Sequence, residues 1–271
     1  GTFQKVPNIF RSNPATRNFD PRIGIAYDPF KDHKTSIRAG FGIFYNPIHA
    51  RSYASGYYFN PPYALAFVPL PQYPNPFPGA LPPPAQLVGV DYNTDVTPRM
   101  LQWNFNIQRE LFESTTLTVG YVGSRGIRLP AVADINVAFG DFSTGRAVFP
   151  TGRRPNPNFD DLRMRYAGAD SFYNSMQLSL QRRLEKGWQY GLSYTWSHNV
   201  DDISGNQTAS DTNTGVNWIT YYPDKGMYRG LSSYDIRHVM SLNSIYEVPV
   251  GQGKAFGANR PGWANAVVGR S

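Results

Sequence analysis

The stretch from Leu101 to Gly126 reads LQWNFNIQRELFESTTLTVGYVGSRG. Apolar and polar residues alternate in both of its halves, which are separated by a few turn residues. Because successive side chains of a β-strand point to opposite faces, this pattern predicts a β-hairpin with one apolar and one polar face. The apolar set is Leu101, Trp103, Phe105, Ile107, Leu117, Val119 and Tyr121. The polar set is Gln102, Asn104, Asn106, Gln108, Thr116, Thr118 and Gly120.

The hairpin alone leaves open which face points inward. A soluble β-sandwich buries the apolar face, whereas a transmembrane β-barrel exposes it to lipid and keeps the polar face inside. The rest of the chain has to decide between these two architectures.

The composition favours an all-β protein with large loops. Of the 271 residues 17% are charged, fewer than the ~25% of average soluble domains, and 15% are aromatic. No apolar run approaches the ~20 residues of a membrane helix, and the mean hydropathy is −0.44, so a helical span is excluded. A β-barrel remains compatible, because alternation keeps the mean hydropathy low.

The net charge of +7 arises from basic residues dispersed in turns and loops. An anionic ligand or an acidic lipopolysaccharide surface would suit this charge, but solvated loop charge is the simpler interpretation. Nucleic acid is not an expected partner, since the sequence has no basic helix and no aromatic RNA-binding signature. The basic residues include Lys31, Arg125, Arg128, Arg153, Arg154 and Lys186.

Cysteine is absent, which excludes disulfides, thiolate metal sites and cysteine nucleophiles. The chain starts with GTFQKVPN and shows no charged region followed by an apolar segment, so no signal peptide is recognisable. We therefore expect an internal piece of a longer precursor if the protein is exported.

The same alternation recurs along the chain and predicts seven strands. Their ranges are near 19–28, 35–45, 100–110, 115–124, 172–183, 188–198 and 234–248. The connections alternate in length: the first, third and fifth take a handful of residues, whereas the others are long loops at 46–98, 125–171 and 199–233. In an up-and-down meander this places every long loop at one rim, an asymmetry typical of outer-membrane barrels with short periplasmic turns and long extracellular loops.

The polar face carries mostly Gln, Asn, Ser, Thr and Gly rather than the Lys, Glu and Arg of a water-exposed sheet, which suits a crowded, hydrated interior. Trp188 and Trp196 stand near opposite ends of one strand, where interfacial aromatic girdles would lie, although two core tryptophans of a sandwich would give the same spacing. The predicted lipid-facing residues are Trp103, Phe105, Ile107, Leu117, Val119, Tyr121, Leu178, Leu180, Leu192 and Tyr194. The predicted lumen-facing residues are Gln102, Asn104, Asn106, Thr116, Thr118, Gln177, Ser179, Ser193 and Thr195.

Two loops have a distinct character. The proline-rich middle of the first, FNPPYALAFVPLPQYPNPFPGALPPPAQL, cannot pair in a ladder; its aromatics favour a packed loop over the barrel mouth, and a disordered linker is the alternative. The acidic residues Asp201, Asp202 and Asp211 could bind calcium, but without regular ligand spacing a solvated turn is the simpler interpretation.

No catalytic constellation is recognisable. Nucleophile-elbow, zinc-protease, phosphate-loop and dinucleotide motifs are absent, and the four histidines lack metal-ligand spacing. We expect no catalytic, cofactor-binding or metal-binding residues and no enzyme activity, which leaves binding or transport.

Four segments, in order, resemble the barrel of TonB-dependent outer-membrane receptors, and the Oar-like type with an N-terminal carboxypeptidase-regulatory-like domain is the subgroup they resemble most. They read NFDPRIGIAYDPFKDHKTSIRAGFGIFYN, PRMLQWNFNIQRELFESTTLTVGYVGSRG, FYNSMQLSLQRRLEKGWQYGLSYTWSHNVDD and YDIRHVMSLNSIYEVPVGQGKAFG. The resemblance covers most of the chain outside the large loops. It implies a barrel of about 22 strands in the outer membrane of a Gram-negative-type bacterium, a plug in the lumen and energy supplied through TonB.

The differences from that family indicate how much of a receptor this sequence contains. No plug, no TonB-contacting segment and no closing strand are visible, and the sequence ends at WANAVVGRS. About seven strands cannot close a bacterial barrel, which needs at least ~8, so we expect a fragment. The expected partners are outer-membrane lipid, an unknown extracellular ligand, and the plug and TonB through a missing N-terminal part. An adhesion or scaffold barrel without transport, or a soluble carbohydrate-binding β-sandwich, are the alternatives.

Overall fold

A computed structural model describes residues 7–47, 60, 86–112, 114–137, 154–159, 161–204 and 226–249. Within these ranges no helix has the length and apolar character needed to cross a membrane. The regular elements are the short 3-10 helix η1 (Pro14–Arg17) and nine strands: β1 (Arg22–Tyr27), β2 (Thr35–Tyr45), β3 (Gln86–Val90), β4 (Arg99–Phe112), β5 (Thr115–Asp134), β6 (Asp161–Glu185), β7 (Trp188–Asp201), β8 (Gly230–Leu231) and β9 (His238–Tyr246). The predicted all-β class is confirmed.

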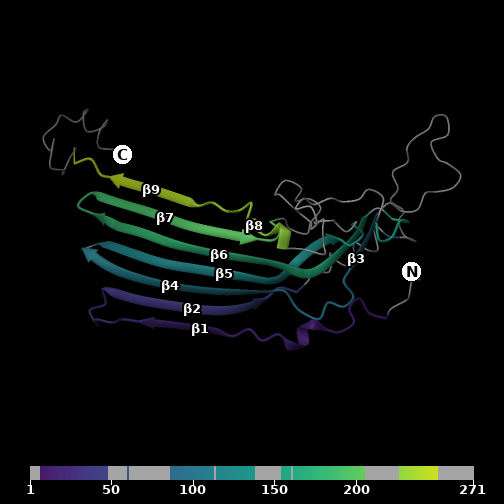
Figure 1. The fold of residues 1–271 in the computed structure, drawn as a ribbon. Coiled ribbons are helices and arrows are strands. Elements are labelled where there is room, and N and C mark those ends of the chain that lie inside the picture. The colour runs from purple at the N-terminus through teal and green to yellow at the C-terminus, as the bar shows by residue number, and fades with distance from the viewer. Residues whose placement is uncertain are drawn as a thin grey trace, which may run out of the picture.

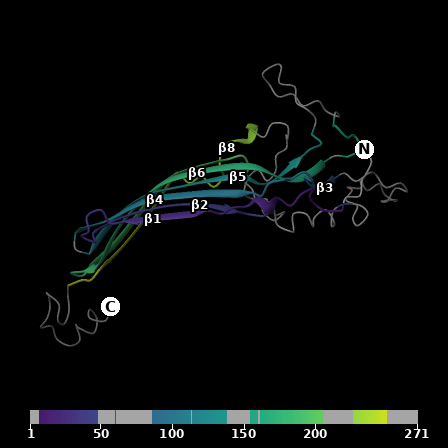
Figure 2. The same ribbon diagram turned by 90° about the horizontal axis from the view of Figure 1, so that it is seen from below.

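The strands form one sheet with the order β1-β2-β4-β5-β6-β7, in which each strand is antiparallel to the next. β8 and β9 both pair with the remaining side of β7. Figure 1 shows these strands side by side, and Figure 2, seen from below, shows that they make a single curved layer. The antiparallel meander is therefore confirmed, and we call β1, β2, β4, β5, β6, β7 and β9 the wall.

Tight turns join the hairpins of the wall at one end of the sheet. The β6–β7 turn has two residues, Lys186 and Gly187, with φ of 52° and 78°. Positive φ at both central residues is the geometry of a type I′ turn, whose twist matches that of the flanking strands. In the β1–β2 turn the Asp28 carboxylate accepts hydrogen bonds from the backbone N–H groups of Phe30, Lys31 and His33 at 3.3, 3.0 and 3.2 Å.

The apolar side chains of the wall do not form a globular core. Phe105 and Val119 remain 44% and 39% exposed. Among the described residues the buried hydrophobic side chains are Val88, Ala131, Val132, Ala133, Tyr166 and Ala169, all of them in β3 or in the long-loop ends of β5 and β6. The described strands thus make one layer rather than the two packed sheets of a sandwich.

The predicted loop at 125–171 is wrong in its extent, because β5 continues to Asp134 and β6 already begins at Asp161. The segment after Gly126 contains Arg128 and Pro130, and a proline at this place in the sequence is typical of a loop. The ladder instead continues through two register shifts, between Gly126 and Leu129 and between Leu129 and Pro130, with Arg128 at φ 53°. β-Bulges of this kind let a strand pass a proline and change direction.

The other two predicted loops also contain strands. β3 lies inside the range 46–98, and it is parallel to β6, whereas only antiparallel pairing was predicted. β8 lies inside 199–233, and β7 runs on to Asp201. These short strands depend on a partner distant in sequence, so no local pattern marks them. The proline-rich segment at 61–85, Asp211 and the terminal WANAVVGRS lie outside the described residues.

Candidate functional site

The register of the wall brings the apolar residues of every strand onto one face. One row of directly opposed residues runs Tyr27, Ile37, Ile107, Val119, Leu178, Tyr194 and Met240. A neighbouring row runs Ile25, Ala39, Phe105, Tyr121, Met176 and Trp196. Directly opposed residues share a face, so the residues predicted to face lipid, on β4 to β7, belong to one continuous apolar surface that extends over seven strands.

The opposite face collects the amide and hydroxyl side chains. One row runs Ser36, Gln108, Thr118, Ser179, Ser193 and Ser241, and another runs Arg38, Asn106, Gly120, Gln177 and Thr195. Neighbours along a strand are linked by weak hydrogen bonds: Asn106 Nδ2 donates to Asn104 Oδ1 at 3.4 Å, and Gln181 Nε2 donates to Ser179 Oγ at 3.4 Å. The residues predicted to face a lumen thus share a surface that still offers donors and acceptors to a partner.

Glycines on the polar face are covered by asparagines of the adjacent strand. Asn106 lies opposite Gly120, where an added Cβ would stand 2.3 Å from Asn106 Oδ1. Gly191 is similarly placed, and a Cβ there would be 2.8 Å from Oδ1 of Asn243 across the β7–β9 pair. The asparagine side chains therefore lie along the sheet over the glycines, so this face is polar and has few projecting side chains.

On the apolar face the indole of Trp103 covers Gly123 in the same way. The two residues are directly opposed, and a Cβ at Gly123 would stand 2.4 Å from indole Cε2 and Nε1. The ring also reaches across to Phe172, whose centroid is 6.3 Å away. Covering a strand glycine with an aromatic ring restores packing that the missing side chain would have supplied.

We expect Gly123→Ala to lower the free energy of unfolding by about 1–3 kcal/mol, because the added methyl group would clash with the Trp103 indole and displace it. The control is Gly24→Ala, where the nearest atom to the new Cβ is 3.9 Å away. Denaturant unfolding of both variants in detergent checks this, and equal midpoints would contradict the packing of Trp103 on Gly123.

Arginines mark both ends of the apolar surface. On β4 the residues of this face run from Arg99 through Leu101, Trp103, Phe105 and Ile107 to Arg109. At the tight-turn end Arg109 donates from Nη1 to Thr35 Oγ1 at 3.1 Å, and its Cζ lies 5.4 Å from the centroid of the Phe30 ring. The apolar stretch of β4 therefore ends in a cation at either side.

Beyond the wall, at the end with the long connections, the outer parts of β5 and β6 continue and β3 joins them (Figure 1). We call residues 129–134, 161–169 and β3 the arm. β3 takes the side of β6 that β7 leaves open, since β7 pairs with β6 only from Ser171 onwards. The arm has a small buried core of Ala131, Ala133, Tyr166 and Ala169.

The Asn60 side chain completes the open edge of β3. Its Nδ2 donates to the Val88 carbonyl at 2.6 Å, and its Oδ1 accepts from the Val88 N–H at 2.8 Å. A side-chain amide here takes the place of a neighbouring strand, which protects the edge from pairing elsewhere.

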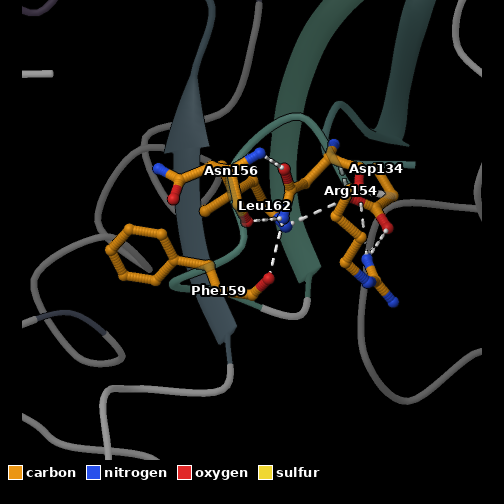
Figure 3. Close-up of polar contacts among 6 residues, drawn as sticks. Asp134, Arg154, Asn156, Phe159 and Leu162 are labelled. Carbon is orange, nitrogen blue, oxygen red and sulfur yellow. Dashed lines mark hydrogen bonds and ion pairs between the residues drawn. The ribbon is translucent and has the colours of Figure 1, made fainter. Parts of the chain in front are cut away.

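A polar network holds the connection between β5 and β6 in place (Figure 3). Asn136, 1% exposed, donates from Nδ2 to the carbonyls of Asn156 and Phe159 at 3.0 and 2.8 Å. Its Oδ1 accepts from the Asn156 N–H at 2.8 Å. Asp134 accepts from the Leu162 N–H at 3.1 Å and pairs with Arg154 Nη1 at 3.3 Å. Two neighbouring side chains of β5 and its extension thereby organise a chain segment about twenty residues further on.

The carboxylates at the long-loop end of β7 accept hydrogen bonds from other groups of the chain. Asp201 accepts from Ser204 Oγ at 2.8 and 3.1 Å, and Asp202 Oδ2 accepts from the Asp170 N–H at 2.9 Å. Within the described ranges no three His, Cys, Asp or Glu residues are grouped so that they could hold a metal ion. Asp201 thus closes a turn with Ser204, whereas Asp202 joins the end of β7 to the backbone of β6.

Sequence reasoning found the two faces of the wall and missed the arm. Asn136, Asp134 and Asn60 received no role, because each acts on a backbone group that only the tertiary structure brings near. A signal was available for Arg99 and Arg109: they stand ten residues apart on the apolar parity of one strand, as the two limits of an apolar band.

The comparisons with known proteins agree with this architecture. A family model described as an outer membrane beta barrel domain matches residues 2–270. The outer membrane transporter YddB from Escherichia coli is a structural neighbour with a TM-score of 0.50 and 13% sequence identity; the alignment covers 84% of this chain and 26% of that one. A chain of the FpvAI–pyocin S2 complex has a TM-score of 0.41, 15% identity and coverage of 85% and 21%. No curated relative matches the chain.

Proposed function

Because this chain belongs to the outer membrane β-barrel domain family and is an outer-membrane protein, we propose that it forms part of the wall and rim of a TonB-dependent receptor, of the Oar-like type. The chain spans 26% of the length of the solved transporter it matches, so the activity proposed is that of a larger barrel. The observation that carries the proposal is the single curved layer with one continuous apolar face and one amide-and-hydroxyl face.

The apolar face is proposed to meet lipid. On β4 Arg109 follows Arg99 by ten positions, which is about 34 Å along the strand at ~3.4 Å per residue. A strand tilted by ~45° turns this into a height of about 24 Å, close to the ~25 Å apolar band of outer-membrane barrels. Lipid is the environment proposed for this face, since the described part of the chain offers no second layer to cover it.

The polar face is proposed to line the lumen and to contact a plug. Backbone edges cannot remain unpaired in lipid, so β1 and β9 require further strands that close the barrel, about 22 in all as the family resemblance implies. The rows of Gln, Asn, Ser and Thr on β4 to β7 offer hydrogen bonds over a wide area through uncharged groups. Such a surface holds a plug in place and still lets it be pulled away by TonB.

The arm is proposed to gather ligand at the extracellular rim. It is the part of the described chain with a buried core of its own and with an organised connection, held by Asn136 and Asp134. A rigid base of this kind positions the long loops above it. No enzyme activity is proposed for the arm.

An adhesion or scaffold barrel is the second candidate, because the wall would be the same without energised transport. A plug in the lumen separates the two. We therefore expect a photo-cross-linking amino acid at Gln177, which is exposed on the polar face, to form a cross-link with a plug within the complete protein in cells.

The matched control places the same amino acid at Leu178, one residue along and on the apolar face, where we expect cross-links to lipid only. Mass spectrometry of the cross-linked peptides identifies the partner, and deletion of TonB should change the yield at Gln177 alone. Absence of any protein cross-link at Gln177 in a folded barrel would favour the adhesion or scaffold candidate.

A further inference from the structure

The polar face of the wall changes in character at its long-loop end. Between the tight turns and the arm, the described residues of this face include two aromatic side chains, Phe44 and Tyr173, and both lie at that end. Tyr173 belongs to a row of directly opposed residues on β4 to β7, which we call the mouth row. Its members are Gln102, Ser124, Tyr173 and Asn199.

The mouth row leaves most of its hydrogen-bonding groups unused. Gln102 is exposed, and the other three members are partly exposed. Within the described ranges, the side chains of Ser124, Tyr173 and Asn199 make no hydrogen bond. Gln102 makes one weak contact, from Nε2 to Met100 Sδ at 3.4 Å. Four neighbouring strands therefore present available amide and hydroxyl groups side by side.

The next row toward the tight turns uses its hydroxyl groups within the protein. Ser175 Oγ donates to the Val122 carbonyl at 3.3 Å, and Ser197 Oγ donates to the Ile236 carbonyl at 2.8 Å. Both serines are buried, with 2% and 8% of their surface exposed. A ligand that arrives from the long-loop end therefore meets the available groups of the mouth row first.

The mouth row is uncharged, and the charged groups at its two ends already have partners. Beside β2, the Cζ atom of Arg22 lies 4.7 Å from the centroid of the Phe44 ring. Beside β7, Asp201 accepts two hydrogen bonds from one serine hydroxyl, and Asp235 pairs with Arg237 at 3.5 Å. A neutral ligand therefore suits the row better than an ion does.

The strand spacing fixes the length of the mouth row. Neighbouring strands are ~4.8 Å apart, so the row extends about 14 Å from Gln102 to Asn199. On the β2 side it is bordered by the Phe44 ring, which covers Gly42: a Cβ added there would stand 2.9 Å from ring Cε2. The row is thus long enough for a chain of several small rings.

We propose that the mouth row binds an uncharged oligosaccharide that enters from the long-loop end. The ring of Tyr173 offers an apolar face to the C–H side of a sugar ring. The amides of Gln102 and Asn199 each offer donors and an acceptor to neighbouring sugar hydroxyls. The inference rests on the proposed function, since it requires the polar face to line a lumen that opens at the long-loop end, and it names the ligand class of that lumen.

The aromatic ring favours a glycan over a surface of the plug as the occupant of this row. Rows nearer the tight turns offer Gln, Asn, Ser and Thr without an aromatic ring, and these groups suffice for hydrogen bonds to a plug. A sugar ring, by contrast, uses both the face of Tyr173 and the amides on either side of it. The strand spacing is also close to the length of one sugar unit, so successive strands present groups to successive units.

The test uses the complete barrel in phosphatidylcholine nanodiscs, applied to an array of immobilised neutral and acidic oligosaccharides. We expect neutral oligosaccharides to be retained in preference to acidic ones, and the most strongly retained one then serves as the probe in a fluorescence titration. The Gln102→Ala/Tyr173→Ala double variant should bind this probe about tenfold more weakly or worse, because the stacking and amide contacts are both lost. Tyr173→Phe, which keeps the ring, should retain most of the affinity.

Gln108→Ala is the matched control, because Gln108 has the same side chain as Gln102 and lies on the same strand and face, nearer the tight turns. Binding of the probe should be unchanged in this variant. The inference is overturned if no neutral oligosaccharide is retained, if acidic ones are preferred, or if the folded, inserted double variant binds the probe as the unmodified barrel does.

Two further readouts separate this inference from the proposed function. If the mouth row holds the plug instead, the double variant should lower the plug cross-link at Gln177 and leave glycan binding unchanged, which overturns the inference and leaves the proposed function standing. Failure of the proposed function would appear as a barrel in which arginine at Val119 is tolerated in the bilayer.

Discussion

Replacing Val119 with arginine in the complete barrel should lower its free energy of unfolding by about 2–4 kcal/mol, the cost of a cation near the middle of the lipid-facing band. Val119 is 39% exposed on the apolar face, and it lies between Ile107 and Leu178 in the ladder. On β5 it stands five residues from Ser114 in the tight turn and six from Arg125, so it is near the centre of the band. No nearby carboxylate on this face could neutralise the new charge.

Thr118→Arg is the matched control. Thr118 is the preceding residue of the same strand, and its neighbours across the ladder are Gln108 and Ser179 on the polar face. An arginine there enters a hydrated lumen and should cost much less. Urea unfolding of both variants in lipid vesicles measures the difference. Equal penalties, or the larger penalty at Thr118, would mean that the polar face meets lipid.

Asn136→Ala should destabilise the arm by about 3 kcal/mol, because three hydrogen bonds are lost and each leaves a backbone group unpaired at ~1 kcal/mol or more. The three groups are the carbonyl and the N–H of Asn156 and the carbonyl of Phe159. The wall should be unaffected, because its ladder does not depend on this connection. Hydrogen exchange should therefore rise in residues 129–136 and 154–165, while β4 and β7 keep their protection.

Asn158→Ala provides the comparison for this experiment. Asn158 belongs to the same connection and has the same side chain, but it is exposed, and among the described residues only its backbone N–H is hydrogen-bonded, to Asn156 Oδ1 at 3.1 Å. Its exchange pattern should match that of the unmodified protein. If the two alanine variants behave alike, the buried position of Asn136 does not hold the arm together.

Features that depend on neighbouring residues could be predicted from the sequence, whereas features that depend on pairing between distant segments could not. The faces of β4 and β5 could be read from Trp103, Phe105 and Val119, because side-chain direction in a strand depends only on parity. The tight turn at Lys186 and Gly187 was equally local. The segment after Gly126 was misread as loop, because Arg128 and Pro130 have loop chemistry and the bulge that accommodates them depends on pairing with β6.

By itself the sequence determined that this protein is an all-β meander with one apolar and one polar face, since alternation and turn chemistry act between adjacent residues. Only the tertiary structure decided which residues meet across strands. Asn136 reaches Asn156, Asn60 closes the edge at Val88, and Arg99 stands beside Arg125. Each of these contacts depends on the register and on where the ladder continues, which are settled by the energy of the whole sheet rather than by any one segment.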